Sequence, residues 1–175
     1  MGAAVDAAEI IARLEEPAED RRPLMGALRE QAPTGGLVEA LAAAREPFAR
    51  QLLADLLGDR GDAAAAEPLA AALEDPDEGV RASAADALGK VFMADEPPGP
   101  EVAQRVGAAM LARLEADPSA AVRRTLASAV GAARYEPAIP ALRAALESDD
   151  RSLAYSAGWG LHWLEGTPPP QLPAS

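Results

Sequence analysis

Apolar residues recur at helical spacing along most of the chain, and short polar turns interrupt them at regular intervals. Within residues 73–89, Val80, Ala84, Ala87 and Leu88 follow the spacing i, i+4, i+7 and i+8, which places them on one side of an α-helix. Alternating patterns that would indicate strands are absent. The hydrophobic pattern therefore predicts an all-α fold built from short amphipathic helices.

The same pattern is repeated along the chain. Residues 73–89 (LEDPDEGVRASAADALG) align with residues 114–131 (LEADPSAAVRRTLASAVG) after one inserted residue, and weaker copies lie 31 residues before the first segment and 31 residues after the second. Each copy predicts a short first helix, a turn whose Asp or Ser caps the next helix, and a second helix with one apolar stripe. A single helical hairpin cannot bury that stripe, so neighbouring hairpins are expected to stack.

Glycine follows the apolar stripe of the second helix in three of these copies. The residues are Gly58, Gly89 and Gly131. A helix C-terminus favours a residue in the left-handed conformation, which glycine adopts without steric cost. These three glycines are therefore predicted to be helix C-caps.

The repeated residues also resemble a known family. They are Asp75-Pro76 with Val80-Arg81 and Gly89, repeated by Asp117-Pro118 with Val122-Arg123 and Gly131. This pattern is similar to that of the HEAT-repeat family, particularly the bacterial HEAT-like units also found in phycobilisome lyases. The resemblance implies a right-handed α-α superhelix, a HEAT-like solenoid of about four to five helical hairpins whose second helices line the concave side. It also implies that the repeat arginines pair with turn aspartates such as Asp75 and Asp117; these arginines are Arg50, Arg81 and Arg123.

The repeats divide the chain into units. The pattern is weak in residues 5–31 and clearer in units 34–58, 62–92, 101–133 and 137–164, and a proline-rich tail covers residues 165–175. Residues 92–100 (FMADEPPGP) lengthen the spacing between the third and fourth units, and their prolines cannot continue a helix. A solvated linker is the favoured interpretation of this loop, and a binding loop is the alternative.

Charge and composition narrow the range of partners. The net charge is −12, whereas binding to a phosphate backbone requires clustered Lys and Arg. Nucleic acid is therefore not expected, and a basic protein partner is compatible with the charge. No segment reaches the roughly 18 apolar residues that indicate a membrane span, so no membrane partner is expected. The absence of cysteine fits a cytoplasmic protein.

No group of residues in the sequence carries recognisable catalytic chemistry. His162 is the only histidine and there is no cysteine, so a multi-histidine metal site has too few ligands and a catalytic triad has one candidate base. A packed or surface histidine is the favoured interpretation of His162. Phosphate-binding loops and zinc-ligand spacings are absent as well. The sequence predicts no catalytic residue, cofactor or metal site, and therefore a protein that is not an enzyme.

The second-helix positions outside the apolar stripe provide the candidate binding residues. These positions are polar or small in the central units and become aromatic in the last unit, at the spacing i, i+4, i+8. Two interpretations remain open: the proline-rich tail covers the aromatic residues, or they form an exposed patch that binds a partner or a second copy in a homodimer. The candidate protein-binding residues are Asp55, Asp59, Asp86, Arg124, Tyr155, Trp159 and Trp163.

Three functions are compatible with this surface. The leading hypothesis is a protein-binding adaptor or regulatory module that uses the concave second-helix face. The alternative is a HEAT-like lyase or another enzyme accessory that acts on a bound small molecule or cofactor, because the phycobilisome lyases that the repeat resembles attach bilin chromophores to cysteines. A self-associating structural protein is the third hypothesis.

Overall fold

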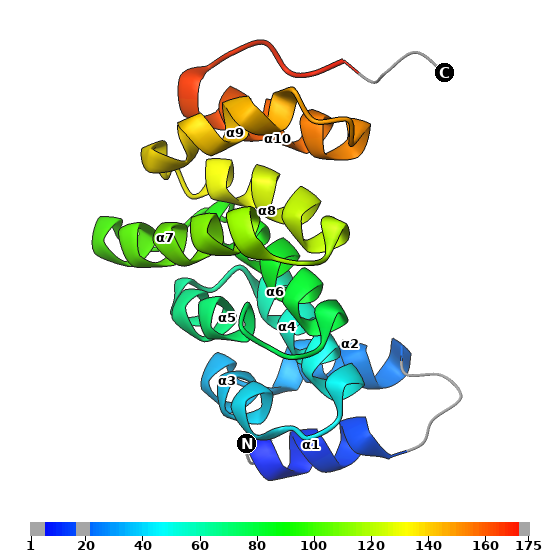
Figure 1. Cartoon of the computed structure of the whole chain (residues 1–175). Helices are drawn as coiled ribbons and strands as arrows, with labels where there is room; N and C mark the ends of the chain where they lie inside the picture. Colours follow the sequence, from blue (N-terminus) through cyan, green and yellow to red (C-terminus); the bar gives the residue numbers. More distant parts are fainter. Residues whose placement is uncertain (1–5, 17–21, 172–175) are drawn as a thin grey trace.

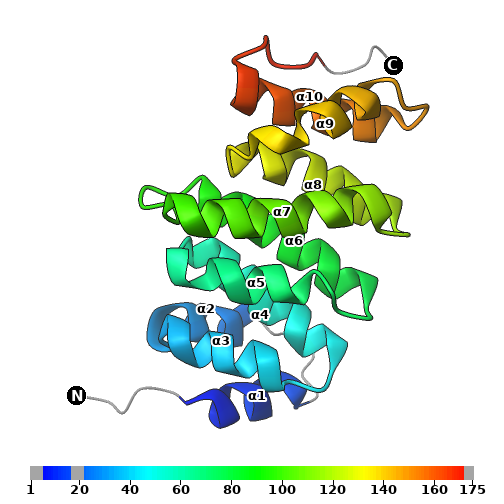
Figure 2. The ribbon, with the colours of Figure 1, turned by 60° about the vertical axis from the view of Figure 1, so that its left-hand side comes forward.

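The computed structural model describes residues 6–16 and 22–171, which form ten α-helices and two short 3₁₀ turns without a strand. The helices are stacked in pairs from the N-terminal to the C-terminal end (Figure 1 and Figure 2). This arrangement confirms the predicted all-α solenoid of helical hairpins. No helix in the described ranges combines the length and the hydrophobicity needed to span a bilayer.

Each of five units contains a first helix and a second helix. The units are α1 (Ala7–Glu15) with α2 (Arg22–Gln31), α3 (Thr34–Ala43) with α4 (Pro47–Arg60), α5 (Ala66–Ala72) with α6 (Glu78–Phe92), α7 (Pro100–Ala116) with α8 (Ala120–Ala132), and α9 (Ile139–Leu146) with α10 (Arg151–Glu165). Short 3₁₀ turns at Ala63–Ala65 and Glu136–Ala138 precede α5 and α9. Residues 93–99 join α6 to α7 outside any helix, as predicted for the proline-containing loop.

Aspartates in the turns hold the start of the second helices. The side chain of Asp77 accepts a hydrogen bond from the backbone N–H of Val80 at 3.1 Å and so caps α6, and Asp150 caps α10 in the same way. Two residues before Asp77, Asp75 accepts the backbone N–H that closes the turn, and Asp117 does the same before α8. These short polar side chains satisfy N–H groups that a helix start leaves free.

The prediction that Gly58, Gly89 and Gly131 are helix C-caps is wrong. All three lie inside their second helices, α4, α6 and α8. Within the described ranges, the left-handed glycines are Gly61 (φ 64°), which ends α4, and Gly166 (φ 67°), which ends α10. The apolar stripe therefore extends beyond the point where the sequence pattern placed the helix end.

Gly58 and Gly131 instead allow neighbouring second helices to approach closely. A Cβ atom on Gly58 would lie 2.6 Å from the Cα of Ala87 in α6. A Cβ atom on Gly131 would lie 2.4 Å from the Cα of Gly160 in α10. Both distances are below van der Waals contact, so a larger residue at either position would push the helices apart. The second helices thus form one closely packed layer.

Leucine and alanine side chains fill most of the space between the two helix layers. Leu53, Leu88 and Leu126 are fully buried, and burial of such a side chain stabilises a protein by about 1.5–3 kcal/mol relative to exposure. The only polar or charged residues that are buried in the described part of the chain are Arg81 and Asp117. This pair lies at a junction between units.

Arginine–aspartate pairs join successive units, as the resemblance implied for two of the repeat arginines. Arg50 donates from Nε and Nη2 to the two carboxylate oxygens of Asp75 at 2.7 and 3.0 Å, and Arg81 donates in the same way to Asp117 at 2.8 and 3.1 Å. Each pair connects the second helix of one unit to the turn of the next. Arg123 forms no ion pair with any described residue, so the expectation is wrong for Arg123.

The Arg81–Asp117 pair is the more deeply buried of the two. The side chain of Asp117 is 0% exposed and that of Arg81 is 7% exposed. Burial raises the pKa of Asp117, but hydrogen bonds from Arg81, the backbone N–H of Ser119 and Arg113 outweigh it and lower the pKa from 3.8 to about 2. The folded chain therefore stabilises the ionised carboxylate.

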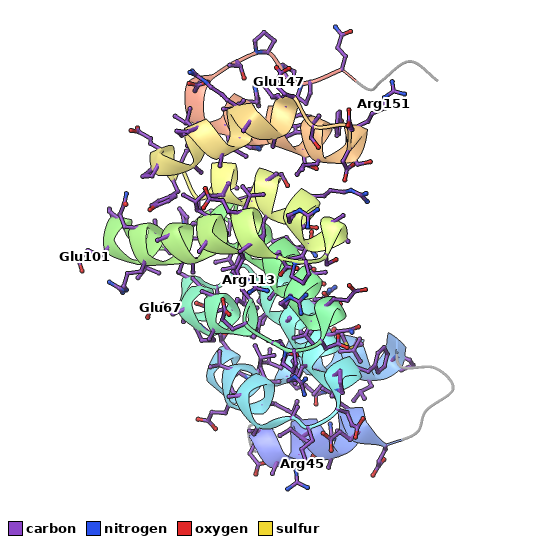
Figure 3. The ribbon with its side chains drawn as sticks, viewed as in Figure 1. Arg45, Glu67, Glu101, Arg113, Glu147 and Arg151 are labelled. Atoms are coloured by element: carbon purple, nitrogen blue, oxygen red, sulfur yellow. The ribbon has the colours of Figure 1, made fainter. Side chains whose placement is uncertain are left out.

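Replacing Arg81 with methionine should destabilise the chain strongly. Arg81→Met keeps most of the side-chain volume but removes the main counter-charge of a buried carboxylate, so we expect the free energy of unfolding to fall by about 3 kcal/mol. Urea denaturation followed by circular dichroism measures this loss. Arg105→Met is the control, because Arg105 pairs with Glu67 at the surface, with both side chains more than half exposed, and Glu67 lies at the edge of the stack in Figure 3.

The control should lose less than about 1 kcal/mol. Equal losses in the two variants would show that burial does not strengthen the Arg81–Asp117 contact.

The depressed pKa of Asp117 predicts a specific loss of stability in acid. A carboxyl group whose folded pKa lies below its unfolded value stabilises the fold above the unfolded value, 3.8, and loses that effect as the pH falls toward 2. From pH 5 to pH 2, the unfolding free energy of the wild type should fall by about 2 kcal/mol more than that of Asp117→Asn. Asp95→Asn, at an exposed position of the loop, should keep the wild-type pH profile.

Candidate protein-binding surface

The predicted binding residues lie on the second helices α4, α6, α8 and α10, which pack against one another in that order. Figure 2 shows the first helices α3, α5, α7 and α9 in front of this layer. We call the side of the layer turned away from the first helices the second-helix face. The structure separates the predicted residues into three groups along this face.

Three predicted aspartates gather around Lys90 of α6. The Lys90 ammonium is 3.0 Å from a carboxylate oxygen of Asp59 and 2.9 Å from one of Asp86. Burial raises the pKa of Asp55, as do the charges of Asp86 and Asp59, while a hydrogen bond with Ser83 and the charge of Lys90 act in the opposite direction. The structure thus brings Asp55, Asp59 and Asp86 together around Lys90, and Arg29 of α2 is a second cationic partner of Asp59.

Arg124 lies apart from this cluster and serves a junction between units. Its Nε donates to a carboxylate oxygen of Asp150 at 2.9 Å. This hydrogen bond is the main cause of the lowered pKa of Asp150, the residue that caps α10. Arg124 therefore holds α10 to α8, and the structure does not place it beside the predicted aspartates.

The aromatic residues of α10 form a group with the single histidine. The ring centroids of Trp159 and Trp163 are 6.4 Å apart, and His162 lies 5.4 Å from Trp159 and 5.5 Å from Trp163. His162 Nδ1 is 2.5 Å from the carbonyl oxygen of Thr167. His162 is half-buried among these contacts, which confirms its interpretation as a packed residue.

The C-terminal segment 166–171 runs back over α10 (red in Figure 1). A Cβ atom on Gly158 would lie 2.9 Å from the ring of Pro170, so the segment touches the helix closely there. Tyr155 lines a pocket of about 350 Å³ together with Pro170 and Gln171. The tail therefore covers the Tyr155 side of α10, which agrees with the capping interpretation for that residue.

A groove crosses α6, α8 and α10 and leaves Trp163 accessible from the second-helix face. We call it the Lys90–Trp163 groove. Its volume is about 140 Å³, and its large apolar side chains are Trp163 and Met93, which is 60% exposed. The groove is lined by Ala85, Asp86, Gly89, Lys90, Met93, Thr125, Ser128, Ala129, Ala132 and Trp163.

A larger pocket of about 1010 Å³ continues the groove at the C-terminal end of α4. It shares Lys90 and Met93 with the groove, and residues 58–63 and 94–97 complete its lining. The proline-containing loop between α6 and α7 therefore borders the candidate site. The charged residues of this pocket besides Lys90 are Asp59, Arg60, Asp62, Asp95 and Glu96.

Sequence reasoning missed Met93, Thr125 and Ser128. Ser128 occupies the same repeat position as Asp86 on the second-helix face, although it was not among the candidate binding residues. Met93 follows the last residue of α6, where a large apolar side chain directly before a polar loop is a usable signal of an exposed contact. Thr125 lies outside the repeat positions that the sequence pattern singled out.

The groove combines two large apolar side chains with one pair of opposite charges. Within residues 6–16 and 22–171, no group of three or more His, Asp or Glu side chains is arranged to hold a metal ion. The charged residues of the groove, Asp86 and Lys90, pair with each other at 2.9 Å. A separate pocket of about 670 Å³ with a mainly apolar lining lies between α3 and α5, in the first-helix layer.

Comparison with known proteins agrees with the stacked hairpins. Residues 34–106, from α3 into α7, match the HEAT repeats family, and no match was found among the curated proteins. The structure is similar to a chain in the complex of CpcE and CpcF of phycocyanin lyase from Nostoc sp. PCC7120, with a TM-score of 0.68 and 21% sequence identity over 95% of this chain and 68% of that chain. The match shows that residues 34–106 carry HEAT repeats, and the structural similarity shows a shared fold over 95% of the chain.

Proposed function

We propose that this chain is a HEAT-repeat binding subunit that assembles with a second protein and acts as an accessory to an enzyme. The observation that carries the proposal is the similarity, over 95% of the chain, to a protein from the complex of CpcE and CpcF of phycocyanin lyase. That protein works within an assembly of two different chains. Because fold similarity alone does not transfer an activity, the rest of the proposal depends on the surface of this chain.

The Lys90–Trp163 groove is the surface that we assign to the partner. Met93 and Trp163 provide large apolar side chains within a surface that also carries charged residues, and tryptophan is among the residues that contribute most to binding energy. The Lys90 pairs with Asp59 and Asp86 are partly exposed to solvent. Such pairs orient a partner more than they add affinity.

The chain itself is proposed to supply binding and no catalytic nucleophile. It has no cysteine, and its single histidine packs between two tryptophans and a backbone carbonyl. General acid–base chemistry needs a side chain that can reach the substrate. The reactive groups of the proposed assembly would therefore come from its other components.

A regulatory adaptor that binds only protein is the second candidate. The groove, at about 140 Å³, is smaller than the roughly 300–1,000 Å³ of pockets that hold small molecules, and this size suits individual side chains of a protein. The pocket between α3 and α5, at about 670 Å³, falls within that range and favours the accessory that handles a small molecule. The two candidates thus use different parts of the chain.

Substitution of Met93 tests the proposed partner surface. Met93→Asp places a charge at an exposed position, so the fold should be retained, while capture of a partner from host lysate should weaken at least tenfold, about 1.4 kcal/mol. Quantitative mass spectrometry measures the captured protein, and circular dichroism checks the fold. Phe48→Asp is the control, because Phe48 is 51% exposed but lies at the start of α4, outside the groove. Equal capture by both variants would exclude the groove as the partner site.

A bilin chromophore tests the small-molecule role. If the chain handles such a molecule in the apolar pocket between α3 and α5, mixing should change the visible absorbance of the bilin. Ala42→Trp would fill this pocket from an exposed position on α3 and should abolish the change. Partner capture without any absorbance change would instead support the adaptor.

A further inference from the structure

The three repeat arginines bind the turn in front of their own helix in the same way. In each case Nη1 donates to two successive backbone carbonyls, at distances from 2.6 to 3.2 Å. The acceptors are Ala44 and Arg45 for Arg50, Asp75 and Pro76 for Arg81, and Asp117 and Pro118 for Arg123. These bonds fix the plane of each guanidinium group, because its five N–H donors form a rigid fork.

The opposite edge of the guanidinium is used in only two of the three arginines. Nε and Nη2 of Arg50 hold the carboxylate of Asp75, and the same atoms of Arg81 hold that of Asp117, at 2.7 to 3.1 Å. The Nε and Nη2 atoms of Arg123 donate to no acceptor in the part of the chain that the structure describes. Arg123 is therefore oriented like the other two but lacks the carboxylate.

One residue of the fifth unit accounts for the missing carboxylate. The side-chain oxygen of Ser148 accepts the backbone N–H of Asp150, two residues ahead, at 3.1 Å. Asp75 and Asp117 accept the N–H two residues ahead in the same way, at 2.9 Å. Ser148 thus occupies the position of these aspartates, and its short neutral side chain provides no counter-charge for Arg123.

We propose that the Nε–Nη2 edge of Arg123 binds a carboxylate from an Asp or Glu side chain of a protein partner. This inference rests on the proposed function, since it names the chemistry of one group on the partner. Two parallel N–H···O bonds to a carboxylate are among the strongest hydrogen bonds in proteins. Because Nη1 is already held by two carbonyls, the side chain loses little further freedom when the carboxylate binds.

The first test uses acetate and needs no partner. The Nε–H signals of the arginine side chains are followed by NMR during titration with sodium acetate, against sodium chloride at equal ionic strength, and Arg123→Lys identifies the Arg123 signal. Arg123 should saturate at an acetate concentration about tenfold lower than Arg45. Arg45 is the control because it is exposed, points away from the ribbon in Figure 3 and forms no side-chain ion pair among the described residues. Equal responses would overturn the inference.

Ser148→Asp provides a second variant, because it should supply the missing carboxylate within the chain. We expect the Arg123 Nε–H signal to take the position of the acetate-bound form without acetate, and the titration to disappear. Ser152→Asp adds the same charge at an exposed position in the first turn of α10 and should leave the Arg123 titration unchanged. An unaltered Arg123 signal in Ser148→Asp would contradict the equivalence of Ser148 with the two aspartates.

The captured partner completes the test. Ser148→Asp should weaken partner binding about tenfold, because the new aspartate occupies Arg123 and the partner loses one charge-assisted contact. Ser152→Asp should bind the partner as the wild type does. A partner that depends on Met93 but binds Ser148→Asp normally would contradict this inference and leave the proposed function standing. If acetate still binds Arg123 preferentially but no partner is captured, the proposed function is contradicted. The proposal that a partner supplies the carboxylate is then contradicted as well.

Discussion

The second helices bury their apolar stripes against their own first helices and against the second helices of neighbouring units, and this stacking controls the spacing between units. Gly58 lies against Ala87, and Gly131 against Gly160, with no space for a Cβ atom. The backbones at these crossings approach more closely than leucine-lined helices could. The Arg50–Asp75 and Arg81–Asp117 pairs add a directional contact at the turn side of two junctions. Packing and charge therefore act at the same places, between neighbours.

Many carboxylates of this strongly acidic chain pair with basic residues in the folded structure. Several carboxylates are held at junctions by arginines, and Asp117 is ionised inside the stack because Arg81 and Arg113 donate to it. On the second-helix face, Lys90 holds two aspartates. These pairs neutralise individual carboxylates locally but leave the net charge of −12 unchanged. The fifth unit lacks the corresponding aspartate, so Arg123, although it donates to two backbone carbonyls, pairs with no carboxylate among the described residues.

The close packing of the second helices also creates the candidate site. Met93 and Trp163 are far apart in the sequence but line one groove. The side chains of α8 between them, Ser128, Ala129 and Ala132, are small and leave a depression between α6 and α10. The C-terminal segment covers the side of α10 that carries Tyr155, whereas Trp163 lines the groove. This groove is the surface that we propose for a partner.

The sequence by itself determined the helices, the turns that cap them and the stacking of repeated hairpins, because these depend on spacing within a few residues of one another. It also indicated that Asp55, Asp59 and Asp86 lie on the second helices outside the apolar stripe. Only the tertiary structure decided the role of the internal glycines, the groove between Met93 and Trp163, and the division of the aromatic group by the tail. These features depend on how closely neighbouring helices approach and on where a chain end folds back, and neither distance is encoded in the spacing of residues along one helix.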